Sequence, residues 1–426
     1  MNVIGLKELI REGGLDSKLA GLYGQENVAK QRERYIRACN GFEDLFPEHH
    51  NVSLFSAPGR TEICGNHTDH QHGCVLAAAV DLDIIGIVAF NSENVIRLQS
   101  EGHSMNVVNI SDLAPQKSEE GTSDALIRGV AAGFKSHGFN VGGFEAYTTS
   151  DVLGGSGLSS SAAFEVLVGT IMDKHYNGGK AGAIEIAKIG QLAENAYFGK
   201  KSGLMDQTAS SVGSSVFIDF ENTTSPKVSA AKCDLDANGY VLFITDTKGS
   251  HADLSDEYSA IPSEMISVAK QLGKDWLRAA DENEFYEKLP ALRKTCGDRA
   301  VLRAAHFFAE NRRAVEAAKA IENNNMTEFL RIVNESGDSS ARLLQNLYAC
   351  SAPQEQGIPV ALMMSSKLLG GEGATRVHGG GFAGTIQAFV PKHLADSYRK
   401  GMDDLFGEGS CHQLRIRNAG GIEIDL

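Results

Sequence analysis

The spacing of the apolar residues changes at Val52 and divides the chain into a helical segment and a mixed one. Residues 4–50 carry apolar side chains at roughly helical intervals among charged ones, which predicts a helical N-terminal extension. Beyond Val52, the runs 75–80 and 84–90 are apolar and β-branched, as expected of buried strands. A chain that combines these two patterns is expected to fold in the α+β class.

The remainder of the chain also combines helical and strand-like segments. Helices are expected at about 162–173, 181–198, 298–322 and 326–347, and strands at 240–245 and 385–390. The irregular stretch 222–229 is rich in Asn, Thr, Ser and Pro and is the predicted domain boundary. We therefore expect an extension at 1–50, a first domain at 51–221 and a second domain at 230–426.

Charge and composition limit the partners of the protein. The 426 residues carry a formal charge of -14, which repels nucleic acids and anionic membranes, so we expect neither as a partner. No apolar run approaches the roughly 20 residues of a membrane span, and a basic-then-apolar start is missing, so a cytosolic location is expected. The seven cysteines contain no Cys-x-x-Cys pair and indicate neither a disulfide framework nor a cysteine-rich zinc site.

The first segment with a possible chemical function lies at 156–161, where a glycine and four serines open a predicted helix. Glycines let backbone N–H groups approach an anion, and a helix N-terminus adds unpaired donors and a favourable dipole. The segment can therefore hold a phosphate, although a flexible loop with an N-cap explains the same residues. It is not a Walker A loop, because no Gly-Lys-Ser/Thr follows.

The second segment is a dense polar turn at 58–72, just before the apolar strands. Arginine, asparagine, histidine and aspartate crowded on one turn suit a polyhydroxylated ligand, because each hydroxyl needs a matched donor or acceptor. His67, Asp69 and His70 also match part of a metallo-hydrolase pattern, but Gly65 replaces one ligand and no complementary set follows. A solvated turn is the remaining alternative.

The third segment, at 377–385, matches Gly-x-Gly-x-x-Gly. It lies near the end of the chain and leads into a strand rather than a helix, so a dinucleotide-binding turn is not indicated. A tight backbone turn next to a ligand fits better.

Together and in this order, the three segments resemble the galactokinase branch of the GHMP kinases. The turn at 59–70 is similar to the signature Gly-Arg-x-Asn-x-Ile-Gly-Glu-His-x-Asp-Tyr, and the serine segment matches the ATP motif of that family. Ala193-Glu194, followed by the run Gly203-Leu204-Met205-Asp206-Gln207, resembles the helix glutamate and catalytic aspartate of galactokinases. The resemblance covers about residues 52–390.

This resemblance implies a two-domain fold with an N-terminal α/β domain, a C-terminal ferredoxin-like domain and an active site in the cleft between them. It implies that Asp206 receives the proton of the anomeric hydroxyl and that Arg60 holds the Asp206 carboxylate. It further implies ATP and Mg²⁺ as partners of the site. The residues that contact the phosphates would be Gly155, Ser156, Gly157, Leu158, Ser159, Ser160 and Ser161. The Mg²⁺ ligands would be Ser161 and Glu194. The residues that bind the sugar would be Asn66, His67, Thr68, Asp69, Gly203 and Tyr258.

Several residues depart from the family pattern. Asn66 stands where galactokinases have a glutamate that accepts a hydrogen bond from the 6-hydroxyl of the sugar, and His70 replaces a tyrosine. Asparagine can still accept that bond, which favours galactose, but it lacks the charge that repels a C6 carboxylate. Galacturonic acid kinases also lack this glutamate, so galacturonate is the alternative substrate. The arginine pair expected after Tyr258 is missing, and Ala383 replaces a glycine.

A different class of relatives binds sugar without turning it over, and those proteins have a shortened serine loop. The serine loop of this chain is complete, and Arg60, Glu194 and Asp206 are all present, so an enzyme is predicted. The oligomeric state is not indicated by the sequence, and a monomer is compatible with it.

Overall fold

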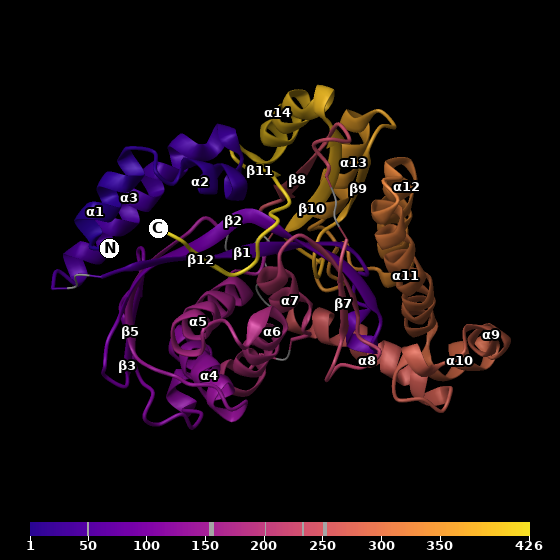
Figure 1. The fold of residues 1–426 in the computed structure, drawn as a ribbon. Coiled ribbons are helices and arrows are strands. Elements are labelled where there is room, and N and C mark those ends of the chain that lie inside the picture. Colours follow the sequence, from indigo (N-terminus) through magenta and orange to yellow (C-terminus); the bar gives the residue numbers. More distant parts are fainter. Residues whose placement is uncertain (49–50, 153–156, 201, 232–233, 250–253) are drawn as a thin grey trace.

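The computed structural model describes residues 1–48, 51–152, 157–200, 202–231, 234–249 and 254–426. Over these residues the strands form two sheets, each covered by helices (Figure 1). The predicted α+β class is confirmed. None of the helices in the described ranges is long and apolar enough to cross a membrane.

The first sheet contains both apolar runs that were predicted as strands, 75–80 and 84–90. Its path runs β12-β1-β2-β5-β3-β4, and β6 and β7 continue from β2. All neighbouring strands are antiparallel except the pair β3 and β5. The strands are β1 (Ser53–Cys64), β2 (Cys74–Phe90), β3 (Val95–Ser100), β4 (Asn106–Asn109), β5 (Phe144–Ser150), β6 (Ser215–Asp219), β7 (Lys227–Ala230) and β12 (Ile422–Ile424).

The apolar strand β2 is buried on both faces, which explains its continuous hydrophobic run. Ile85 and Ile87 pack with the N-terminal helices, whereas Ile84 and Val88 pack in the core on the opposite face. One face is covered by α1 (Val3–Arg11), α2 (Asp16–Tyr23) and α3 (Val28–Leu45), and the other by α4 (Ser123–Ser136), α5 (Ser160–Asn177), α6 (Gly182–Ala193) and α7 (Met205–Val212), as Figure 1 shows.

The second sheet has the order β11-β8-β10-β9 and is antiparallel throughout. Its strands are β8 (Tyr240–Asp246), β9 (Ala374–Val377), β10 (Thr385–Pro391) and β11 (Cys411–Leu414). The helices of this half are α8 (Ser255–Gln271), α9 (Glu282–Glu287), α10 (Leu289–Cys296), α11 (Asp298–Glu322), α12 (Met326–Ser339), α13 (Gly357–Leu369) and α14 (Ala395–Phe406). After this half is complete, the chain returns and its last strand, β12, pairs with β1 of the first sheet.

A buried ion cluster ties the N-terminal helices and the returning C-terminal segment to the first sheet. The fully buried carboxylate of Asp83 accepts hydrogen bonds from Arg34 at 2.7 Å, Arg417 at 2.8 Å and the Tyr23 hydroxyl at 2.6 Å. Burial raises the pKa of Asp83, but the two arginines outweigh this effect and hold it below its usual value. The contribution of Asp83 to stability is therefore present at neutral pH and is lost as the pH falls through that lowered pKa.

We expect Asp83→Asn to lower the free energy of unfolding by about 3–5 kcal/mol, because it leaves two buried arginines without their shared carboxylate. Urea denaturation monitored by circular dichroism measures the change. The control is Asp236→Asn, which removes a carboxylate from an exposed pair with Lys392 and is expected to leave stability unchanged. Equal stability of Asp83→Asn and the wild type would contradict this role.

Candidate active site

The centre of the candidate site is an ion pair between strand β1 of the first sheet and helix α7, which packs against that sheet. Arg60 of β1 donates from Nε to Oδ1 of Asp206 at 2.8 Å and from Nη2 to Oδ2 at 2.7 Å. The guanidinium thus holds both carboxylate oxygens in a bidentate arrangement. Asp206 lies in the first turn of α7, where the helix dipole also favours a negative charge.

The serine segment is docked on the same strand. The backbone N–H of Arg60 donates to the Leu158 carbonyl at 3.0 Å, and Nη1 of Arg60 donates to the Gly157 carbonyl. Gly59 allows this approach, because a Cβ at that position would lie 2.9 Å from the carbonyl oxygen of Leu158. Ser159, with a left-handed φ of 56°, donates from its hydroxyl to Asp206 at 2.7 Å. The predicted phosphate segment and the predicted catalytic pair are therefore in direct contact.

These contacts determine the protonation state of Asp206. Burial raises the pKa of its carboxyl, but the charge and hydrogen bonds of Arg60 and the hydroxyl of Ser159 outweigh burial and hold that pKa below its usual value. Asp206 is therefore ionised at neutral pH and is a weak base in the absence of substrate.

The two predicted Mg²⁺ ligands meet at the start of α5. Oγ of Ser161 lies 3.2 Å from Oε1 of Glu194, which is the first residue of a π-helical turn at 194–198 that follows α6. Lys200 and Gln207 also donate to Glu194, at 2.9 and 3.0 Å. A hydroxyl and a carboxylate are hard oxygen donors that suit Mg²⁺, so these residues fit the ion.

Gln207 links Glu194 to a second buried carboxyl group, Glu165, at 2.9 Å. Burial, together with the charge of Glu194, raises the pKa of Glu165 well above its usual value. Lys200 and Glu165 were missed by the sequence analysis, because neither residue stands in a segment whose spacing alone indicates contact with Glu194.

The polar turn contains residues that face different ways. Thr68 is fully buried, and its Oγ1 lies 2.6 Å from the Cys74 carbonyl oxygen and 2.8 Å from that of Gly65. Asp69 remains partly exposed and lies next to Gly203, where a Cβ would come within 2.2 Å of its Oδ2. The hydroxyl of Thr68 therefore closes the turn, whereas the Asp69 carboxylate lies beside the loop that leads to Asp206.

The third segment packs directly on this turn. Nε2 of His67 donates to the Gly380 carbonyl at 3.0 Å, and Nδ2 of Asn66 donates to the Gly379 carbonyl at 2.8 Å. Burial, followed by the neighbouring His70, lowers the pKa of His67 to about 3, so its ring is neutral at physiological pH. The hydroxyl of Tyr258 donates to the Gly381 carbonyl at 3.0 Å.

The structure thus brings Arg60, Asp206 and the polar turn together with residues 157–161 and 379–381. Gly155 and Ser156, which the sequence analysis assigned to the phosphates, lie outside the described residues. Ser160 is exposed at the first position of α5. No group of three or more His, Cys, Asp or Glu side chains that could hold a metal occurs in the part of the chain that the structure describes.

Comparisons with known proteins identify the family of this chain. The family model "Galactokinase galactose-binding signature" matches residues 40–90, and "GHMP kinases N terminal domain" matches residues 125–214. The galactokinase of Streptomyces coelicolor is 30% identical over 373 residues, which cover 86% of this chain and 92% of that protein. This chain belongs to the galactokinase family.

Other relatives and solved structures support the family assignment and the fold. The galactokinase of Limosilactobacillus fermentum is 29% identical over 378 residues, 86% of this chain and 92% of that protein. The crystal structure of Lactococcus lactis galactokinase complexed with galactose has a TM-score of 0.76 at 23% identity and covers 90% of this chain and 98% of its own. The crystal structure of Methanococcus jannaschii mevalonate kinase has a TM-score of 0.61 at 14% identity and covers 86% of this chain and 98% of its own. The predicted GHMP kinase fold is confirmed.

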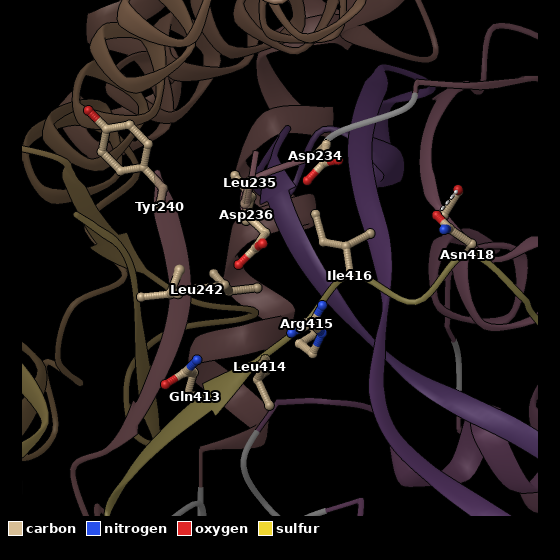
Figure 2. A pocket seen from close by; sticks show the side chains of 12 residues that line it. Asp234, Leu235, Asp236, Tyr240, Leu242, Gln413, Leu414, Arg415, Ile416 and Asn418 are labelled. Carbon is tan, nitrogen blue, oxygen red and sulfur yellow. Dashed lines mark hydrogen bonds between the residues drawn. The ribbon is translucent and has the colours of Figure 1, made fainter. Parts of the chain in front are cut away.

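A separate cavity of about 560 Å³ lies between β8, β11 and the segment that follows β11 (Figure 2). It shares no lining residue with the galactokinase motifs. Two of its charged side chains form ion pairs, Asp236 with Lys392 at 2.8 Å and Arg415 with Glu26 at 2.9 Å, and Asp234 accepts from the backbone N–H of Ala237 at 2.9 Å. The residues predicted from the motifs instead gather around the Arg60–Asp206 pair.

Proposed function

We propose that this galactokinase family member transfers the γ-phosphoryl group of ATP to the anomeric hydroxyl of galactose, giving galactose 1-phosphate in the cytosol. The observation that carries the proposal is the bidentate Arg60–Asp206 pair in contact with residues 157–159. This pair places a carboxylate base and a cation beside a segment suited to phosphate.

In this mechanism the anomeric hydroxyl donates to Asp206, and its oxygen attacks the γ-phosphorus as the bond to ADP breaks. The proton of the hydroxyl passes to Asp206 as its oxygen forms the new bond to phosphorus, and the electron pair of the broken bond stays on ADP. Because Arg60 keeps the pKa of Asp206 low, orientation of the hydroxyl contributes alongside proton removal. Arg60 also stabilises the negative charge on the transferred group, and the start of α5 supplies backbone donors to the phosphates.

Ser161 and Glu194 are the residues that would hold Mg²⁺ with ATP. When bound, the ion neutralises charge on the phosphates during transfer. Lys200 and Gln207 keep the Glu194 carboxylate in place from two sides. Asp69, Gly203 and His67 are proposed to line the sugar.

We expect Ser161→Ala and Glu194→Gln to raise the Mg²⁺ concentration needed for half-maximal activity by about tenfold, because each removes one oxygen ligand. The KM for the sugar should change little. Activity is titrated against Mg²⁺ at saturating sugar. The control is Glu185→Gln. Glu185 is a partly exposed carboxylate on helix α6, the helix that ends immediately before Glu194. Unchanged Mg²⁺ curves with a raised sugar KM would place both residues on the sugar instead.

The proposed function is tested by measuring ATP consumption with galactose, galacturonic acid, N-acetylgalactosamine and arabinose in the presence of Mg²⁺. The expected result is consumption of ATP with galactose and a product phosphorylated at C1, identified by phosphorus NMR. A protein that ignores galactose and phosphorylates galacturonate at C1 would refute the choice of sugar, and one that binds galactose without consuming ATP would refute the kinase.

A further inference from the structure

The residue that replaces the expected sugar-binding glutamate has no free hydrogen-bonding group. Asn66 is fully buried, and its Nδ2 donates to Oε1 of Glu62 at 3.1 Å and to the Gly379 carbonyl at 2.8 Å. Its Oδ1 accepts from Nδ2 of Asn346 at 2.8 Å. The Ser340 hydroxyl donates to the same Oδ1 at 3.4 Å. A side-chain amide offers two N–H donors and an oxygen with two lone pairs, so these four partners use both donors and both lone pairs. Asn66 therefore serves the protein rather than a ligand.

The partner of Asn66, Glu62, is placed on the catalytic side of the strand. Irregularities of β1 lie between Pro58 and Arg60 and between Glu62 and Cys64, so residues 60–62 form a short regular stretch between two bulges. Side chains two residues apart on a strand point to the same face. Glu62 therefore lies on the same face as Arg60, whose guanidinium holds Asp206.

The charges around Glu62 come from four elements. Arg60 lies on its own strand, Asp69 on the 3-10 turn η2 (Asp69–Gln71), and Arg376 of β9 has its Nη2 3.8 Å from Oε1 of Glu62. Behind Arg376, Glu310 of α11 lies 3.9 Å from its Nη1. Burial is the largest influence on Glu62 and raises its pKa to about 7, although Arg376 and the bond from Asn66 lower it.

Comparison with the family signature shows that the two residues are exchanged. The signature has asparagine at position 62 and glutamate at position 66, whereas this chain has Glu62 and Asn66. In this chain the two side chains are hydrogen-bonded to each other, and the carboxylate is carried by strand β1. The chain has therefore not lost a carboxylate from this turn, which was the observation that favoured galacturonate.

We propose that Glu62, held by Asn66, is the residue that selects the sugar in this chain: its carboxylate accepts a hydrogen bond from a hydroxyl of a neutral hexose and, with Asp69, excludes sugars that carry a C6 carboxylate. The inference rests on the proposed function in that both use the same sugar site. Two carboxylates on one side of the site repel a third at close range, which disfavours uronic acids.

The test measures binding of galactose and galacturonate by calorimetry, with a non-hydrolysable ATP analogue present. The wild type is expected to bind galactose about 100-fold more tightly than galacturonate at about pH 8, with a smaller ratio at about pH 6, where Glu62 is largely protonated. In Glu62→Gln, the Kd for galactose should rise about tenfold and the ratio should no longer depend on pH. His70, whose Nε2 lies 3.7 Å from Asp69, is still present in this variant. If the affinity ratio no longer changes with pH, the pH dependence of the wild type is therefore due to Glu62.

Two controls separate recognition from folding. Glu145→Gln removes a buried carboxylate of β5 that pairs with Arg97 of β3, and it is expected to leave both sugar affinities unchanged. The affinity of Glu62→Gln for the ATP analogue should equal that of the wild type. If Glu62→Gln does not fold, the exchange variant Glu62→Asn with Asn66→Glu replaces it, and this variant should bind galactose more tightly than Asn66→Glu alone, which places two carboxylates side by side.

An unchanged galactose Kd in a folded Glu62→Gln, a wild type that prefers galacturonate, or an exchange variant no better than Asn66→Glu would each overturn the inference. Failure of the proposed function has a different signature. A wild type that binds galactose through Glu62 but consumes no ATP would contradict the kinase and leave the assignment of Glu62 supported.

Discussion

The variant Asp206→Asn is expected to lose turnover by about a thousandfold while still binding ATP, because it removes the proton acceptor and keeps the shape of the side chain. The amide would accept from Arg60 through one oxygen only, whereas the carboxylate accepts from Nε and Nη2 at 2.8 and 2.7 Å. Its NH₂ group would face either the guanidinium or the Ser159 hydroxyl, which now donates to Oδ2 at 2.7 Å. The anomeric hydroxyl would then meet a neutral group that cannot take its proton.

Three measurements check this result: kcat with galactose, the affinity for ATP and the melting temperature. The control is Asp124→Asn, since Asp124 also lies in the first turn of a helix, α4, but outside the candidate site. We expect that control to retain kcat. Full activity of a folded Asp206→Asn would show that the carboxylate is not the base and would leave positioning by Arg60 as the main contribution of this part of the site.

Local patterns predicted several of the longer helices and the strands β2, β8 and β10, but not the other strands in the described residues. The helix expected at 298–322 is α11 (Asp298–Glu322), and the one expected at 181–198 is α6 followed by a π-helical turn that ends at Gly199, with a left-handed φ of 88°. These elements are determined by side chains a few residues apart, which a sequence pattern records directly. The runs 75–80 and 84–90 proved to be one continuous strand, β2, because Asp81 and Asp83 are accommodated within it by buried partners.

Long-range pairing was beyond the reach of such patterns. The boundary at 222–229 assigned everything after residue 230 to the second domain, yet β12 (Ile422–Ile424) pairs with β1. A strand of three residues has too few positions for a recognisable alternation, and its place depends on a partner more than 350 residues away in the chain. The pairing of Arg60 with Asp206 joins residues that lie 146 positions apart in the chain, and it was reached through resemblance alone.

The polar turn shows a different limit of sequence reasoning. Asn66, Thr68 and Asp69 look equivalent in the sequence as hydroxyl-binding groups. In the structure the side chains of Asn66 and Thr68 are fully buried and bonded to the protein, while that of Asp69 keeps some exposure. Which way a polar side chain points depends on the packing of residues 340–346 and 379–380 against the turn, and no local pattern records that packing.

The variant Arg60→Lys is expected to lower kcat by about 100- to 1000-fold, although it retains the positive charge. The guanidinium of Arg60 makes three directed contacts, two with Asp206 and one with the Gly157 carbonyl, and a single ammonium cannot reproduce this planar fork.

Because Arg60 is the main opposing influence that lowers the pKa of the buried Asp206 carboxyl, a weaker pair should let that pKa rise. The acid limb of the pH profile of kcat/KM should therefore move to higher pH, and a purely structural lesion would not cause this shift. The control Arg97→Lys alters a partly exposed pair with Glu145 and should keep the wild-type profile. An unshifted acid limb in a folded Arg60→Lys would mean that Arg60 does not set the protonation of Asp206. The fall in kcat would then come only from weaker stabilisation of the charge on the transferred phosphoryl group.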